Sequence, residues 1–120
     1  MDILRSSKRE KRTMSKIYIS GPISGISDYR ARFDVAAQEI RAKGYEAINP
    51  CDLDAILNPQ TTSWQQFMLA DMGLLRACDA VCLIEGWETS RGSRMELREA
   101  QRLGMTIYKS PDNVPERREG

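Results

Sequence analysis

Apolar and polar positions in the first part of the chain follow two spacings, one typical of a strand and one typical of a helix. Residues 16–20, KIYIS, form a short run of apolar and β-branched side chains that ends at a Gly-Pro pair, which is typical of a turn. The loop GPISGIS follows, and Ser27 or Asp28 stands where a helix would be capped. From there to Gly44, apolar residues recur at helical spacing and predict one helical face: Tyr29, Phe33, Ala36, Ala37 and Ile40.

The alternation of strand-like and helix-like segments continues along the chain. Ser63 is positioned to cap a second long helix, and the run DAVCLIEG is apolar almost throughout, as expected of a strand buried on both faces of a parallel sheet. Strand and helix alternate without a repeat or an internal linker, which predicts an α/β layer structure with a mostly parallel sheet and right-handed crossovers. The remaining predicted elements are strands at 45–49, 79–86 and 105–109, helices at 64–78 and 93–103, and a connection with one helical turn at 51–62.

Two loops in this pattern have unusual chemistry. SGPISGIS follows the strand at 16–20, and GWETSRGS follows the strand at 79–86. In open α/β sheets, ligands bind outside the carboxyl ends of the strands. The two loops are therefore the predicted walls of a ligand site.

Composition indicates one ordinary soluble domain. The chain has 120 residues, 41% of them hydrophobic and 29% charged, and its net charge of +1 gives no strong signal for nucleic-acid or membrane binding. Residues 1–14 are an expected flexible basic tail, 15–110 the expected domain, and 111–120 an expected flexible C-terminal tail. Met14 is a candidate alternative start. The chain lacks the apolar run of a signal peptide or membrane span, so a cytoplasmic location is expected.

The chain has three cysteines and no histidine. An odd number of cysteines without an export signal argues against a disulfide framework, and the lack of histidine removes most zinc sites and both common catalytic triads. Cys78 and Cys82 are interpreted as small core residues. We therefore expect no metal.

Two carboxylates fall on apolar helix faces. At about 100° per residue, Asp71 lies in the middle of the apolar stripe of the helix at 64–78. Burying an ionised carboxylate without partners is costly, so Asp71 either forms a hydrogen bond with a neighbouring helix end or loop amide in a purely structural role or has a function.

Glu96 shares the inward face of its helix with Ala100 and Leu103. Ser93 and Glu96 also have the spacing of a capping box, so the spacing leaves capping and function equally open for Glu96.

The neighbouring residues add candidate binding groups. Ser90, Gly92 and Ser93 offer hydroxyls and free backbone N–H groups at a helix N-terminus, a ready site for a phosphate or for sugar oxygens. Trp87 is a candidate for stacking on a base, and equally for a packing residue. The hydroxyl of Tyr18 needs a partner if it is buried, and a carboxylate at the head of the sheet would be a natural one.

The order of these motifs resembles the nucleoside 2-deoxyribosyltransferase superfamily. The resemblance runs from residue 16 to 108 and rests on Tyr18 with SGPISG, on Asp71 in DMGLLRACDAV, and on GWETSRGSRMELREAQRLGM. It is greatest to a short branch with an SGP loop and a GW..S.G...E motif. It implies a doubly wound, flavodoxin-like (Rossmann-like), mostly parallel sheet of four to five strands with helices on both faces. It also implies a homodimer or a higher homo-oligomer with sites near the subunit interfaces, and no cofactor.

The resemblance also implies roles for residues. Glu96 matches the nucleophile, Tyr18 the tyrosine that orients it, and Asp71 the aspartate that aids proton transfer beside the nucleobase or sugar. Transferases of the superfamily have an acidic residue six positions before the nucleophile, where this chain has Ser90; that favours a monophosphate-hydrolase-like site. The matching residues for sugar and phosphate binding are Ser20, Gly21, Ser90, Gly92 and Ser93.

The expected function is therefore cleavage or exchange of the N-glycosidic bond of a deoxynucleoside or its 5'-monophosphate, through a glutamate nucleophile. One alternative is a non-catalytic module that binds a nucleotide or a nucleotide-derived signal in the same cleft. A third is an interaction domain whose basic tail contacts an acidic partner. Arg91 and Arg94 are placed either to contact a phosphate or to face solvent.

Overall fold

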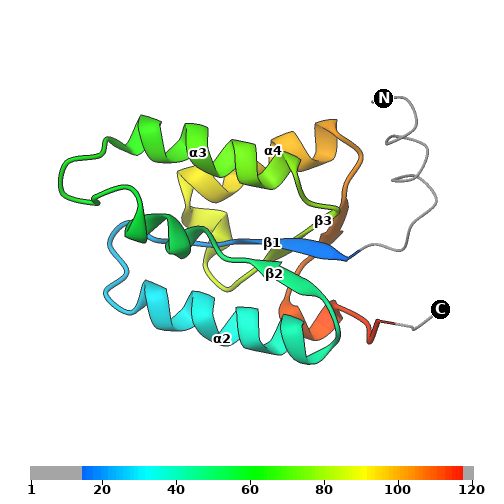
Figure 1. Cartoon of the computed structure of the whole chain (residues 1–120). Coiled ribbons are helices and arrows are strands. Elements are labelled where there is room, and N and C mark those ends of the chain that lie inside the picture. Colours follow the sequence, from blue (N-terminus) through cyan, green and yellow to red (C-terminus); the bar gives the residue numbers. More distant parts are fainter. Residues whose placement is uncertain (1–14, 118–120) are drawn as a thin grey trace.

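The computed structural model describes residues 15–117. Four parallel strands form one sheet in the order β2-β1-β3-β4. Helix α2 covers one face of the sheet and helices α3 and α4 cover the other (Figure 1). The predicted α/β class, parallel sheet and helices on both faces are thus confirmed. The elements are β1 Lys16–Ser20, α2 Tyr29–Ala42, β2 Glu46–Ile48, the 3₁₀ helix η1 Pro50–Ala55, α3 Trp64–Arg76, β3 Ala80–Leu83, η2 Trp87–Thr89, α4 Arg91–Arg102, β4 Thr106–Tyr108 and η3 Pro111–Asn113.

The alternation of side chains along β1 divides the core into two layers. Successive residues of a strand point to opposite faces of a sheet. Ile17 and Ile19 pack with the apolar face of α2, whose buried residues are the predicted Phe33, Ala36, Ala37 and Ile40. Tyr18 points to the other face and packs with Leu75 of α3 and Ala100 of α4. β1 therefore delivers every second side chain to the layer between the sheet and helices α3 and α4.

The chain changes the direction in which it adds strands to the sheet at β1. The chain passes from β1 to β2 on one side and then crosses to β3 on the other, with Ser20 aligned with Leu83. The chain therefore leaves β1 and β3 toward opposite faces of the sheet at its carboxyl edge, where doubly wound folds bind ligands. Directly after the two strands the loops are in close contact, since a Cβ placed on Gly21 would lie 2.2 Å from Cγ1 of Ile84. Glycine at position 21 allows this close approach.

The packed chain extends beyond residue 110, where a flexible tail was expected to begin. Val114 is 2% exposed and belongs to the core between α2 and the sheet. Nζ of Lys43, after the end of α2, donates hydrogen bonds to the carbonyl oxygens of Pro111 at 2.7 Å and of Val114 at 2.8 Å. Residues 111–117 are thus fastened to α2. The predicted basic tail, with Met14, and residues 118–120 lie outside the described part of the chain.

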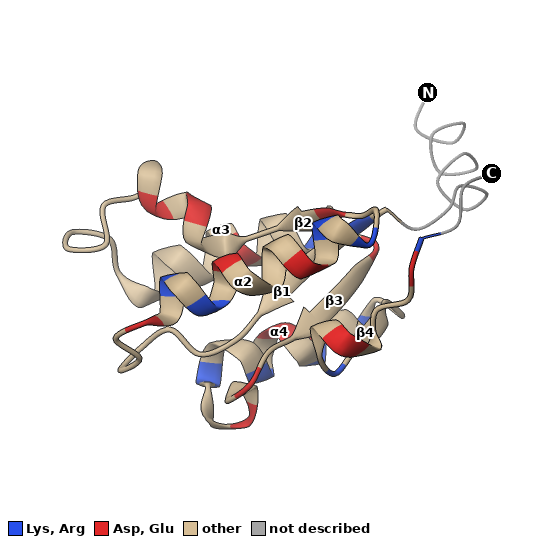
Figure 2. Ribbon diagram, turned by 90° about the horizontal axis from the view of Figure 1, so that it is seen from below, with Lys and Arg blue, Asp and Glu red and all other residues tan. Residues whose placement is uncertain are grey.

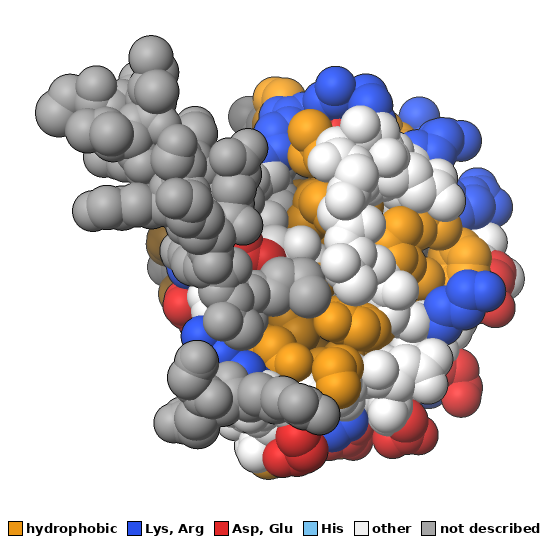
Figure 3. Space-filling view, turned by 90° about the vertical axis from the view of Figure 1, so that its right-hand side faces the viewer, with side chains coloured by type: hydrophobic (Ala, Val, Ile, Leu, Met, Phe, Trp, Pro, Cys, Tyr) orange, Lys and Arg blue, Asp and Glu red, His pale blue; other side chains and the backbone are white. Residues whose placement is uncertain are grey.

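Charged residues of both signs occur along α2 and α4 (Figure 2). Figure 3 views the end of the molecule at which the strands begin, where apolar side chains gather in the middle of the face with charged side chains around them. Among the described residues, no helix is both long enough and apolar enough to cross a membrane.

Candidate functional site

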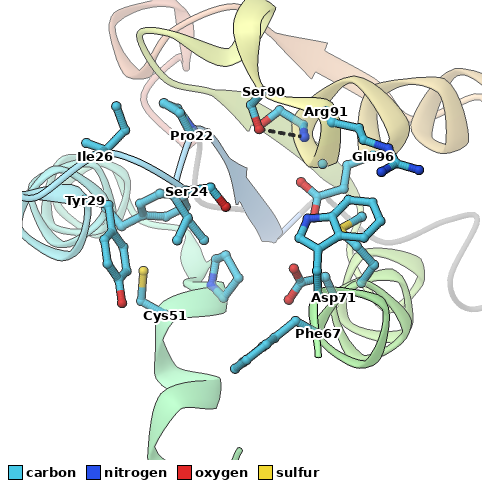
Figure 4. Close-up of a pocket in the computed structure, with 18 of the residues that line it drawn as sticks. Pro22, Ser24, Ile26, Tyr29, Cys51, Phe67, Asp71, Ser90, Arg91 and Glu96 are labelled. Atoms are coloured by element: carbon cyan, nitrogen blue, oxygen red, sulfur yellow. Dashed lines mark hydrogen bonds between the residues drawn. The ribbon is translucent and has the colours of Figure 1, made fainter. Parts of the chain in front are cut away.

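A cavity of about 540 Å³ opens at the carboxyl edge of the sheet, where the sequence predicted a ligand site. This volume is within the range of small-molecule sites. Its walls include the loop after β1, the start of α2, the 3₁₀ helix after β2, and the N-terminal parts of α3 and α4. Figure 4 shows Glu96 and Asp71 on one side of this cavity and Tyr29 and Cys51 on the opposite side.

Glu96 is the buried carboxylate at the centre of the site. Its side chain reaches from α4 to the carboxyl end of β1, and the residue is only 5% exposed. The Tyr18 hydroxyl donates a hydrogen bond to Oε2 at 2.7 Å, and the Ser20 hydroxyl donates one to Oε1 at 2.6 Å. Because Tyr18 and Ser20 are two residues apart on one strand, both side chains point to the same face. β1 thus holds both oxygens of Glu96 in place.

The alternative role of Glu96 in a capping box is wrong. α4 begins at Arg91, and Ser90 is its N-cap, with its hydroxyl accepting a hydrogen bond from the backbone N–H of Ser93 at 3.2 Å. Glu96 lies more than one turn inside the helix, and both its oxygens accept bonds from β1. The expected inward face of α4 is also shorter than predicted. Ala100 is buried, but Leu103 follows the last helical residue and is 42% exposed.

Asp71 is the second buried acid, 7% exposed, and it meets Glu96 from α3. Burial raises its pKa from 3.8 to about 7, and the nearby charge of Glu96 adds to the rise. Burial also raises the pKa of Glu96 to about 7, while hydrogen bonds from Ser20, Tyr18 and Asp71 act in the opposite direction. These bonds favour the ionised form of Glu96. The charge of Glu96 and the hydrogen bond to it favour the protonated form of Asp71.

The first turn of α4 offers free hydrogen-bonding groups to the cavity. Ser93 lines the cavity and is 1% exposed, and its hydroxyl has no hydrogen-bond partner within residues 15–117. A buried hydroxyl without a partner costs free energy, so this atom is suited to a ligand. The amides of the helix N-terminus add a partial positive charge there. An anionic or oxygen-rich group fits this corner.

The first residues of α3 and α4 meet beside the cavity. The guanidinium of Arg91 lies over the ring of Trp64, with Cζ 4.4 Å from the ring centroid, in a cation–π contact. Both residues line the cavity. Arg94 does not line it, and its Nη1 instead donates a hydrogen bond to the carbonyl oxygen of Glu88 at 3.2 Å. Gly92 allows the two helices to approach, since a Cβ there would lie 3.2 Å from Sδ of Met68.

The structure brings most of the candidate residues together. Gly21, Ser90, Gly92, Ser93, Asp71 and Glu96 line the cavity, and Tyr18 and Ser20 lie fully buried behind Glu96. Trp87 is not brought to the site. It lies in η2 and packs against the core layer beneath α3 and α4, which agrees with the alternative interpretation of Trp87 as a packing residue.

The sequence pattern missed several residues of the cavity walls. Asp54 and Tyr29 line the cavity, and so do Trp64 and Phe67, which the helical spacing of α3 had indicated only as parts of its apolar stripe. The position of Asp54 carried one usable signal: it follows β2, and all parallel strands end at the same edge of a sheet. Within the described part of the chain, no group of three or more His, Cys, Asp or Glu residues could hold a metal ion.

Comparisons with known proteins bear on the fold. The structure matches that of a 2-desoxiribosyltransferase from Leishmania mexicana with a TM-score of 0.58 and 22% sequence identity. The match covers 78% of this chain and 61% of that one, so the chain spans less than two thirds of the length of the other protein. At this identity the match shows the fold alone, and for the fold it confirms the resemblance read from the motifs. The comparison with curated proteins gave no significant match. Residues 15–109 match a family described as Domain of unknown function (DUF4406).

Proposed function

Because this chain belongs to the DUF4406 family, whose description assigns no function, we propose a function from the chemistry of its own cavity. The proposed activity is cleavage or exchange of the N-glycosidic bond of a deoxynucleoside or its 5'-monophosphate. Glu96 is the proposed nucleophile, Asp71 the proposed proton donor, and Tyr18 and Ser20 the residues that position Glu96. The similarity to a deoxyribosyltransferase in fold is consistent with this activity but does not carry it.

The observation that carries the proposal is the Glu96 carboxylate, buried at the cavity wall and fixed through both oxygens. A carboxylate held in one place beside a sugar stabilises the oxocarbenium-like centre that develops at C1' when the bond to the base breaks. Positioning it in advance avoids reorganisation during the reaction. The neighbouring acid, Asp71, retains its proton near neutral pH, as a general acid must.

The first step of the proposed reaction forms a glycosyl ester. An oxygen of Glu96 bonds to C1' while the bond from C1' to the base nitrogen breaks. The electron pair of that bond stays on the base, which takes the proton of Asp71. The base leaves neutral, and Asp71 becomes a carboxylate.

The second step returns both acids to their first state. Water or a second base attacks C1', the ester bond breaks, and its electron pair restores the Glu96 carboxylate. Asp71 takes the proton that the attacking water or base gives up. Attack by water makes the chain a hydrolase and attack by a base makes it a transferase.

The first turn of α4 supports a 5'-monophosphate as the substrate. The unpartnered Ser93 hydroxyl and the helix N-terminus suit a phosphate oxygen. Ser90 contributes no negative charge at the position where transferases of the resembled superfamily have an acid. Arg91 lies beside the same corner and adds positive charge. Trp87 packs against the core and is not a proposed binding residue.

The expected homodimer or higher oligomer remains a prediction. Sedimentation equilibrium of the full chain tests it, with a single species of monomer mass as the contradicting result. The cytoplasmic location also remains a prediction.

The proposal is tested by incubating the protein with a panel of deoxynucleosides and their 5'-monophosphates, with and without free bases, and separating the products by chromatography. We expect release or exchange of a base by the wild type and none by Glu96→Gln. Glu88→Gln is the matched control, because Glu88 is exposed in η2, just before α4, and does not line the cavity. Binding of nucleotides without turnover of any member would reject catalysis in favour of the binding module.

A further inference from the structure

The wall of the cavity opposite Glu96 carries a third carboxylate, Asp54 of η1. The Tyr29 hydroxyl donates a hydrogen bond to its Oδ2 at 3.1 Å, and the guanidinium of Arg30 forms an ion pair with the same oxygen. Tyr29 and Arg30 both lie at the start of α2. Two residues of one element thus fix the position of this side chain.

Both contacts use the same oxygen of Asp54. Within residues 15–117, no hydrogen bond reaches Oδ1, and this oxygen is not among the fully enclosed polar atoms without a partner. The Asp54 side chain is 15% exposed and lines the cavity. Oδ1 is therefore an acceptor that is open to a ligand, on a carboxylate whose orientation is already fixed.

The surroundings of Asp54 suit a flat aromatic ligand. Tyr29, Phe67, Pro50 and Cys51 line the same cavity, so the space beside the carboxylate has aromatic and apolar walls. The sugar and phosphate groups are accounted for on the other side, by Glu96 and the first turn of α4. Asp54, Asp71 and Glu96 all line this one cavity. A ligand that touches the catalytic pair can thus reach Asp54 as well.

We propose that Oδ1 of Asp54 accepts a hydrogen bond from an exocyclic amino group of the substrate's base. The inference rests on the proposed function for the kind of ligand, a nucleotide, and adds which bases the cavity selects. A carboxylate only accepts hydrogen bonds, so it attracts an amino group and repels the lone pairs of a carbonyl oxygen in the same place. The site therefore prefers adenine to hypoxanthine and cytosine to uracil, two pairs that differ in an amino group against a carbonyl.

The expected preference follows from the strength of such a bond. When a hydrogen bond to a charged group is replaced by a repulsive contact, the affinity falls by roughly ten- to a hundredfold. Asparagine at position 54 would keep an oxygen for Tyr29 and Arg30 and turn its NH₂ group toward the ligand. Asp54→Asn should then abolish the preference or reverse it in favour of the carbonyl bases.

The test measures the binding of dAMP against dIMP, and of dCMP against dUMP, by titration calorimetry. It is done on Glu96→Gln protein, in which the proposed cleavage cannot proceed, with and without Asp54→Asn. Asp52→Asn is the matched control, because Asp52 is exposed on the same 3₁₀ helix and does not line the cavity. Each comparison is a ratio of two ligands on one protein sample, so a fraction of misfolded protein cancels.

We expect affinity ratios of about ten or more for the amino member of each pair, kept by Asp52→Asn and lost or reversed by Asp54→Asn. Ratios near one, ratios that Asp54→Asn leaves unchanged, or no binding of any of the four nucleotides would overturn the inference. The proposed function fails separately. Amino-selective binding without base release by the wild type rejects catalysis alone, and base release without selectivity rejects only the role of Asp54.

Discussion

Replacing Asp71 with asparagine should make the protein more stable at alkaline pH. Burial keeps Asp71 protonated in the folded protein until its raised pKa of about 7, whereas the unfolded chain loses that proton near 3.8. A group whose pKa is raised by folding contributes its full stabilisation below its pKa in the unfolded chain. This stabilisation is lost as the pH rises to the pKa of the group in the folded protein. Asparagine resembles the protonated acid at every pH and can also donate a hydrogen bond to Glu96.

The size of the effect follows from the two pKa values. Each pH unit between 3.8 and about 7 is worth roughly 1.36 kcal/mol, so the wild type should lose about 4 kcal/mol of unfolding free energy relative to Asp71→Asn. This is a large share of the roughly 5–15 kcal/mol that stabilises a domain. We expect the two proteins to be equally stable near pH 4 and to differ by the full amount at pH 8.

Urea unfolding between pH 4 and pH 8 measures this difference. For an m value of about 1–2 kcal/mol/M, the midpoint at pH 8 should be about 2–4 M higher for Asp71→Asn. Asp52→Asn, which changes an exposed acid, controls for the loss of one charge. Midpoints of wild type and Asp71→Asn that keep the same separation at every pH would refute the reasoning. A less stable variant at pH 8 would refute it as well.

Three further predictions concern the parts around this pair. Tyr18→Phe removes a hydrogen bond that lowers the pKa of Glu96, so the acidic limb of the pH–rate profile should shift to higher pH and base release should fall roughly ten- to a hundredfold; an unchanged profile would contradict this. Gly21→Ala should lower the unfolding free energy by about 1–3 kcal/mol, because its Cβ has no room, whereas Gly73→Ala, in open space on α3, should raise it by up to about 1 kcal/mol in the same urea assay; equal effects would count against the packing described. Ser93→Ala breaks no hydrogen bond within the described structure, so thermal unfolding should be unchanged while calorimetry shows weaker binding of a monophosphate relative to its nucleoside; equal weakening of both would exclude a phosphate contact.

Most of the fold was readable from the sequence because each element had its own local signal. The alternation along β1, with Ile17 and Ile19 on one face and Tyr18 on the other, required two layers of helices. Ser63 caps α3 with a capping box, as its position indicated. The signal was weakest after residue 110, where the segment has few apolar residues and a single valine, Val114, is buried in the core.

The candidate site was predictable where a residue contradicted its local pattern. Asp71 and Glu96 were found because a carboxylate on an apolar face needs an explanation. Spacing alone could not exclude a capping role for Glu96, because either Ser90 or Ser93 could be the N-cap of α4. The structure shows that Ser90 is the N-cap and accepts the hydrogen bond from a free backbone N–H of the first turn. Asp54 could not be found in this way, because an aspartate in a polar connection violates no pattern. Its place in the cavity depends on how η1 packs against α2, which only the structure gives.

The most direct test of the central claim is whether Glu96 becomes covalently attached to the sugar. The protein would be mixed with a 2'-fluoro deoxynucleoside monophosphate, whose fluorine slows hydrolysis of the ester, quenched in acid, digested and analysed by mass spectrometry. We predict that the peptide containing Glu96 gains the mass of one fluorodeoxyribosyl phosphate, with one base released per site. The Glu96→Gln protein should gain none. Base release with an unmodified Glu96 peptide, or an adduct on a different residue, would contradict the account.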